Sequence, residues 1–172
     1  ACDVIAWLAR QDWCSGTVGM MGKSWGGFNC LQTAFLQPPA LKAVISVYST
    51  TDRFADDIHF KGGALLGENF GWGSVMLSYS SRPGDPLLHN GWRETWLKRL
   101  EAEPFHAPGW AAHQSRDAYW KHGSICEDWD RMTVPILSIG GWNDNYMNTV
   151  AALMENARGP VKGIIGPWVH QY

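Results

Sequence analysis

One serine of the chain lies in a motif that is typical of a catalytic nucleophile. Gly22-Lys23-Ser24-Trp25-Gly26-Gly27 is a G-x-S-x-G motif, placed between an expected strand over residues 17–21 and an expected helix over residues 25–35. A nucleophilic serine needs a tight, strained turn between strand and helix, with small residues beside it. That turn exposes the Ser24 hydroxyl and directs the Trp25 backbone N–H at a developing oxyanion. The motif therefore predicts acyl transfer at Ser24.

A serine nucleophile requires a general base, and the base requires an acid that orients it. Asp144 ends the run Gly140-Gly141-Trp142-Asn143-Asp144, directly after an expected strand over residues 134–139. His170 ends the run Gly166-Pro167-Trp168-Val169-His170, directly after an expected strand over residues 161–165. Right-handed crossovers would bring both runs to the same sheet edge as Ser24. We expect Asp144 to contact His170 Nδ1 and His170 Nε2 to lie near Ser24 Oγ, in the chain order of α/β-hydrolases.

The other histidines fit the role of base less well, because they fall in an irregular middle block and none follows an expected strand. Each is expected to be a surface or hydrogen-bonded helix histidine; they are His59, His89, His106, His113 and His122. A Ser-Lys pair with Lys23 is disfavoured, since neighbouring side chains on such a turn diverge. Cys30 is expected to be a core thiol.

A carboxylate cluster beside His59 raises the alternative of a metal site. Asp52, Asp56 and Asp57 supply the carboxylates, but their spacing matches no ligand pattern. We favour charge pairs with Arg53 or Lys61, or a helix N-terminal charge cluster. The prediction is therefore a site with no metal and no organic cofactor.

The apolar patterns predict an α/β fold with a mostly parallel sheet. A first strand–helix–strand unit covers strands 17–21 and 41–48 with a helix over 25–35, after an opening helix that ends near residue 11. A second unit covers strands 134–139 and 161–165 with a helix over 149–157. The block between them shows glycine-rich stretches, two helices over residues 92–101 and 111–121, and no strand alternation. It predicts a helical insertion at about residues 52–132, resting on the sheet edge.

Composition narrows the functional classes. The chain has 172 residues, 45% hydrophobic and 17% charged, which fits one packed domain. A formal charge of −2 gives no reason to expect nucleic acid or an anionic membrane as partner. The four cysteines form no C-x-x-C pair, so neither a disulfide scaffold nor a zinc knuckle is expected. No apolar run approaches the roughly 18 residues of a membrane span. The eleven tryptophans indicate core packing first and an aromatic acyl pocket second. They could also form a sugar-stacking platform, which leaves an inactive ligand-binding domain as an alternative.

The three motif runs together resemble the cocaine-esterase/X-Pro dipeptidyl-peptidase family of α/β-hydrolases, the CocE/NonD hydrolases. Residues 3–13 and 52–59 are also similar to segments of that family. The resemblance implies a triad of Ser24, Asp144 and His170, the Trp25 N–H as one oxyanion donor, and a helical cap. It also implies N-terminal strands, a second oxyanion donor from a tyrosine of an earlier loop, and a C-terminal jelly-roll domain that this chain does not contain. The chain is therefore expected to be a partial catalytic domain.

The expected substrate is a small-molecule ester or a short peptide, and the sequence does not choose between an esterase and an X-Pro dipeptidyl-peptidase. Family members that act on α-amino-acid esters carry extra carboxylates after the triad acid, whereas Asn145, Tyr146 and Met147 stand there. An amino-ester specificity is therefore not expected. The aromatic residues expected to line the pocket are Phe54, Phe60, Trp72, Trp142 and Trp168.

Overall fold

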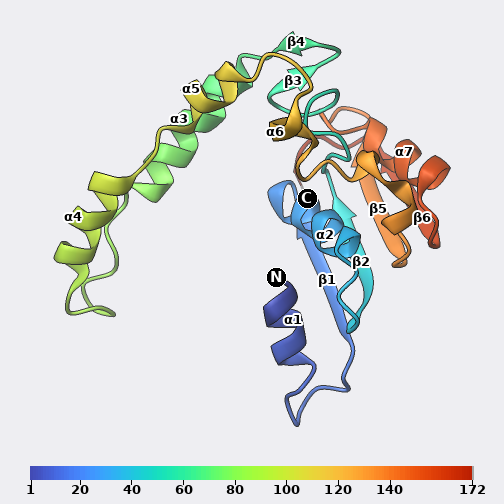
Figure 1. Cartoon of the computed structure of the whole chain (residues 1–172), viewed down its shortest axis with the longest axis horizontal. Coiled ribbons are helices and arrows are strands. Elements are labelled where there is room, and N and C mark those ends of the chain that lie inside the picture. The colour runs from blue at the N-terminus through green and yellow to red at the C-terminus, as the bar shows by residue number, and fades with distance from the viewer. Residues whose placement is uncertain (172) are drawn as a thin grey trace.

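A four-stranded parallel sheet forms the body of the molecule (Figure 1), in a computed structural model that describes residues 1–171. The strand order is β1-β2-β5-β6, with bounds β1 Val18–Lys23, β2 Leu41–Val47, β5 Ile136–Gly141 and β6 Val161–Gly166. Lys23 pairs with Val47, Val47 with Ile139, and Gly141 with Gly166. The carboxyl ends of all four strands therefore meet at one edge.

Helices from both strand–helix–strand units pack on one face of this sheet. Helix α2 (Trp25–Phe35) joins β1 to β2, and α7 (Asn148–Asn156) joins β5 to β6. Two right-handed crossovers that run in the same direction place their helices on the same side. Leu31 of α2 and Leu153 of α7 accordingly share one buried cluster with Val44 and Ile136 of the strands. The predicted α/β fold is confirmed, and α2 has the predicted bounds.

The opening helix and the middle block differ from the sequence-based expectation in several places. Helix α1 (Cys2–Leu8) ends three residues earlier than expected. The block between β2 and β5 contains a hairpin, β3 (Phe60–Lys61) and β4 (Ala64–Leu65), which forms a sheet of its own. Strands of two residues are too short to show alternation in the sequence, and they do not continue the four-stranded sheet.

The helices of the middle block form two groups. Helices α3 (Glu68–Ser80), α4 (Trp92–Ala102) and α5 (His106–Ala112) project away from the sheet, and we call residues 68–112 the arm (Figure 1). Helix α6 (Ala118–Lys121) and the short helices η1 (Ile125–Glu127) and η2 (Trp129–Arg131) return the chain to the sheet. The expectation that the whole block rests on the sheet edge is therefore wrong for the outer part of the arm, around α4.

Two of these helices were mispredicted for local reasons. Helix α3 was not predicted, because Gly71 and Gly73 are poor helix formers. Gly73 is required by packing, because a Cβ there would lie 2.9 Å from the Cβ of Ala107 on α5. The helix expected over residues 111–121 is broken in two, since the Asp117 side chain accepts a hydrogen bond from Tyr119 N and starts α6. Within residues 1–171 no helix is long and apolar enough to cross a membrane.

Candidate active site

Ser24 adopts a strained backbone conformation at the point where β1 meets α2. Its φ is 56° and its ψ is −122°, in the half of backbone space that favours glycine. Such strain costs on the order of 1–3 kcal/mol and must be held by surrounding contacts. The Ser24 N–H donates to Val47 O at 2.8 Å, and the Phe28 N–H donates to Ser24 O at 2.9 Å. The turn is therefore hydrogen-bonded both to strand β2 and to helix α2, as the strained turn of a nucleophile requires.

Two of the motif's glycines are required by close backbone contacts and one is not. A Cβ at Gly22 would overlap the backbone of Gly26, and a Cβ at Gly27 would lie 2.8 Å from Val47 O. A Cβ at Gly26 would meet no atom within 4 Å. The close crossing of α2 over β1 therefore depends on Gly22 and Gly27.

Asp144 and His170 are joined by a short hydrogen bond. The Asp144 Oδ2 to His170 Nδ1 distance is 2.6 Å, and the Asp144 side chain is fully buried whereas 38% of the His170 side chain is exposed. Asp144 Oδ1 accepts a second hydrogen bond from the Tyr146 N–H at 2.7 Å. The carboxylate is thus fixed at both oxygens, and it orients the imidazole with Nε2 left for other chemistry.

The loops that carry these two residues are hydrogen-bonded to each other. The Trp142 N–H donates to Gly166 O at 2.9 Å, and the Asn143 N–H donates to Trp168 O at 3.2 Å. The backbones cross so closely that a Cβ at Gly141 would overlap the carbonyl group of Trp168. Gly141 therefore permits the close contact between the two loops.

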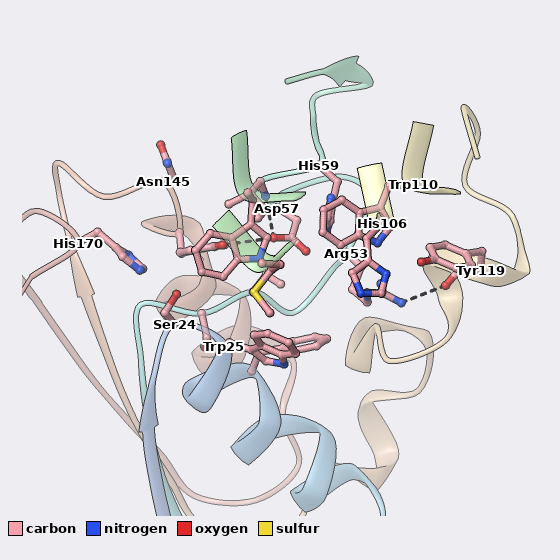
Figure 2. Close-up of a pocket in the computed structure, with 17 residues that line it drawn as sticks. Ser24, Trp25, Arg53, Asp57, His59, His106, Trp110, Tyr119, Asn145 and His170 are labelled. Carbon is pink, nitrogen blue, oxygen red and sulfur yellow. Dashed lines mark hydrogen bonds between the residues drawn. The ribbon is translucent and has the colours of Figure 1, made fainter. Parts of the chain in front are cut away.

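Ser24 and His170 line the same pocket and lie beside each other at one end of it (Figure 2). No hydrogen bond joins Ser24 to His170 in the part of the chain that the structure describes. Such contacts are often long in ligand-free sites and tighten when substrate binds. The rings of Tyr48 and Tyr146 lie 5.6 Å from the His170 ring, centroid to centroid, and pack against it.

The pocket encloses about 480 Å³, within the range of small-molecule sites. Its walls come from the loop after β2, from α2, from the loop after β5 and from the arm, which supplies Trp72, Met76, His106 and Trp110. Residues that are far apart in the sequence therefore build it together.

Of the five aromatic residues expected in the pocket, only Trp72 lines it. Phe60 is 1% exposed and packs against Phe54 and Trp120 at ring centroid distances of 4.6 and 5.6 Å, so Phe54 and Phe60 belong to a neighbouring aromatic cluster. Trp142 is 64% exposed, and the Trp168 ring covers Gly166. These four assignments were wrong, because the two phenylalanines pack in that cluster and the backbone of the crossed loops turns the two tryptophans outward.

Several polar residues of the pocket were not predicted. Asp57 is buried, and its Oδ1 accepts from the Ile58 N–H at 2.6 Å and the Tyr146 hydroxyl at 3.3 Å. Burial raises the pKa of Asp57 to about 6. Burial also lowers the pKa of His59, which hydrogen-bonds Asn69 at 2.8 Å. Their only signal in the sequence is a dense polar run in the loop after a strand, a common place for binding residues.

The three carboxylates of this run do not converge. Asp56 forms an ion pair with Lys61 at 2.8 Å, as predicted, whereas Asp52 pairs with Arg116 at 3.3 Å. Arg53, the other cation considered, forms no ion pair within residues 1–171. Among residues 1–171, no group of three or more His, Cys, Asp or Glu side chains is arranged to hold a metal ion.

Known structures resemble this chain over almost its whole length. A CocE/NonD family hydrolase from Staphylococcus aureus superposes with a TM-score of 0.71 at 20% identity, covering 96% of this chain and 27% of that one. An α-amino acid ester hydrolase superposes with a TM-score of 0.66 at 24% identity, covering 99% of this chain and 31% of that one. At these identities the likeness shows the fold, that of an α/β-hydrolase.

Sequence comparison leads to the family. The chain is 26% identical to the cocaine esterase of Rhodococcus sp. (strain MB1 Bresler) over an alignment 194 positions long, gaps included, which covers 98% of this chain. It spans 33% of the length of that relative. The model of the X-Pro dipeptidyl-peptidase (S15) family matches residues 1–172. The chain therefore belongs to the S15 family of serine hydrolases, which groups esterases with peptidases.

Proposed function

We propose that Ser24, His170 and Asp144 form a catalytic triad that hydrolyses carboxylic esters through an acyl-enzyme. The observation that carries the proposal is the hydrogen bond from His170 Nδ1 to a fully buried Asp144, beside a serine on a strained turn in the same pocket. Buried carboxylate, oriented imidazole and exposed hydroxyl are the three roles that acyl transfer needs.

In this mechanism Ser24 Oγ attacks the ester carbonyl carbon while His170 Nε2 takes the hydroxyl proton. Asp144 stabilises the imidazolium that forms and holds its tautomer. The oxyanion of the tetrahedral intermediate accepts a hydrogen bond from the Trp25 N–H at the start of α2, where the helix dipole adds to the stabilisation. Collapse expels the alcohol, which takes the proton from His170. A water activated by His170 then releases the acid and restores Ser24.

A second candidate is X-Pro dipeptidyl-peptidase activity, and Asp57 is the observation that favours it. A peptidase of this kind must hold the free N-terminal ammonium of its substrate, and Asp57 places a buried carboxylate in the pocket. Turnover of a p-nitrophenyl ester beside that of a Gly-Pro anilide decides between the two activities.

The direct test is p-nitrophenyl butyrate hydrolysis by the full-length protein and its Ser24→Ala variant. We expect the substitution to lower kcat by at least about 10⁴-fold, and Asp144→Asn to lower it by about 10⁴-fold. Ser15→Ala is the matched control, because Ser15 is exposed and its hydroxyl, within residues 1–171, bonds to that of Thr17 alone. Turnover that survives in Ser24→Ala would show that hydrolysis takes place at another residue and would overturn the proposal. Absence of turnover in the unaltered protein would favour a ligand-binding domain without chemistry.

A further inference from the structure

One arginine lies in the pocket on the side opposite the proposed triad. Figure 2 shows Ser24 and His170 at one end of the pocket and Arg53, His106 and Tyr119 at the other. Arg53 belongs to the loop that follows β2, and its side chain is half-buried. Neither the proposed mechanism nor the packing of the sheet uses this cation.

The Arg53 guanidinium is held rigidly by backbone and ring contacts. Its Nη1 donates to Tyr119 O at 3.1 Å and to His122 O at 2.8 Å. Its central carbon lies 5.4 Å from the centroid of the Tyr119 ring and 5.2 Å from that of the Trp120 ring. These contacts remove rotamer freedom before any ligand binds, which is the cost that a binding site must otherwise meet.

The remaining N–H donors of Arg53 are available to a ligand, although its charge also interacts with the Asp57 carboxylate across the pocket. A guanidinium has five N–H donors, and the three that remain have no acceptor among residues 1–171. No carboxylate of that part of the chain lies within ion-pair distance of Arg53. The edge formed by Nε and Nη2 is the edge that binds a carboxylate through two parallel hydrogen bonds.

We infer that Arg53 binds a carboxylate at the far end of the substrate, so that the preferred substrates are esters whose acyl group ends in a second carboxylate. The inference rests on the proposed function. It assigns the carboxylate to the acyl group because that group stays in the pocket through both steps of an acyl-enzyme reaction. A carboxylate fits better than a phosphate dianion, because Arg53 is the one Lys or Arg among the residues that line the pocket.

The Asp57 carboxylate should repel this anion, so its removal should change the selectivity in the opposite direction from removal of Arg53. Asp57 lines the same pocket, and one of its oxygens is bound by the Ile58 N–H and the Tyr146 hydroxyl. Removing its charge should favour an acidic acyl group, whereas removing the charge of Arg53 should disfavour it. Two substitutions in one pocket thus predict opposite changes in selectivity.

The experiment compares kcat/KM for mono-p-nitrophenyl glutarate with that for p-nitrophenyl pentanoate, a neutral ester with the same number of acyl carbons, using the full-length protein. We expect Arg53→Gln to lower the ratio of acidic to neutral ester at least 10-fold and Asp57→Asn to raise it. Arg53→Lys should lower the ratio less than Arg53→Gln. Arg93→Gln is the matched control, since Arg93 also lies over an aromatic ring, Trp92, but is exposed on the arm and does not line the pocket.

An unchanged ratio in Arg53→Gln overturns the inference, and it leaves the proposed function standing if Ser24→Ala still abolishes turnover of the neutral ester. Survival of that turnover in Ser24→Ala would instead overturn the proposed function. Should Arg53→Gln fail to fold, inhibition of the unaltered protein decides. Glutarate must then inhibit at least 10-fold more strongly than pentanoate, and equal inhibition overturns the inference.

Discussion

The strained backbone of Ser24 depends on how closely its neighbours approach. Gly22 and Gly26 cross with no room for a Cβ on Gly22, whereas the Cβ position of Gly26 is open. The two glycines of the G-x-S-x-G motif are therefore unequal in this protein.

We predict that Gly22→Ala lowers the free energy of unfolding by roughly 3 kcal/mol or more, because the clash is with backbone that cannot move aside. Gly26→Ala should change it by at most about 1 kcal/mol and in the stabilising direction, since alanine is the better helix former. Urea unfolding of both variants measures this difference. Equal destabilisation by the two substitutions would contradict the crossing described here.

The raised pKa of Asp57 makes the free energy of unfolding depend on pH. Burial raises its pKa from 3.8 to about 6, so the folded state binds the proton more tightly than the unfolded state does. The folded state therefore loses stability as pH rises from about 4 to about 6, by about 3 kcal/mol in total. Asp57→Asn mimics the protonated form and should be more stable than the unaltered protein at pH 7. The advantage should vanish near pH 4 in urea unfolding at a series of pH values, and a constant difference would refute it.

The sequence predicts those residues of the site that follow directly from a strand end, and it misses those that only the packed fold brings together. The motif runs predicted the contact between Asp144 and His170 correctly, because each of these residues comes shortly after the end of a strand. Arg53 and Asp57 could not be recognised as pocket residues, because only the packed loop after β2 brings them into the pocket. The two tryptophans were wrongly predicted to line the pocket for the same reason, since Trp142 and Trp168 lie close to Asp144 and His170 in the sequence but point away from the pocket.

Among the elements, the loops after β5 and β6 work as one unit. The backbone hydrogen bonds of Trp142 and Asn143 tie the loop of Asp144 to that of His170, and Gly141 permits their approach. The distance between Asp144 and His170 is therefore set by backbone contacts and not by the side chains alone.

Gly141→Ala should accordingly lower kcat by about 10²-fold or more, since displacement of catalytic groups by about 1 Å has an effect of this size. The added methyl would push the Trp168 carbonyl away and carry His170 with it. Steady-state kinetics with p-nitrophenyl butyrate measures the loss, with Gly71→Ala on the open side of α3 as control. Unchanged kcat in Gly141→Ala would show that the loops do not set the geometry.

The elements themselves were predicted in proportion to their regularity. Strands and helices of the two parallel units have strong apolar patterns, and their predicted bounds agree with the structure to within about two residues. Helix α4 was also found, from its own amphipathic pattern. Helix α3 and the β3–β4 hairpin were missed, because glycines needed for packing and strands of two residues carry no periodic pattern.

For the molecule as a whole, the arm is the part least bound to the sheet. Helix α4 buries no residue, and Leu87 and Leu88 in the loop before it are 92% and 85% exposed. Brief digestion with chymotrypsin should therefore cut this chain first near Leu87 or Leu88, at an exposed loop tip. Mass spectrometry of the first fragments identifies the site. A first cut within the parallel sheet would contradict the division into sheet and arm.

If Ser24 is a nucleophile activated by His170, it must react with a reagent that labels such serines covalently. Trypsin cuts after Lys23 and Lys42, and the resulting peptide of residues 24–42 contains Ser24 as its only serine. After treatment of the full-length protein with a fluorophosphonate, we expect one adduct per chain, on this peptide. We also expect none in Ser24→Ala and much slower labelling in His170→Ala. An adduct on another residue, or equal labelling of the two variants and the unaltered protein, would contradict this role of Ser24.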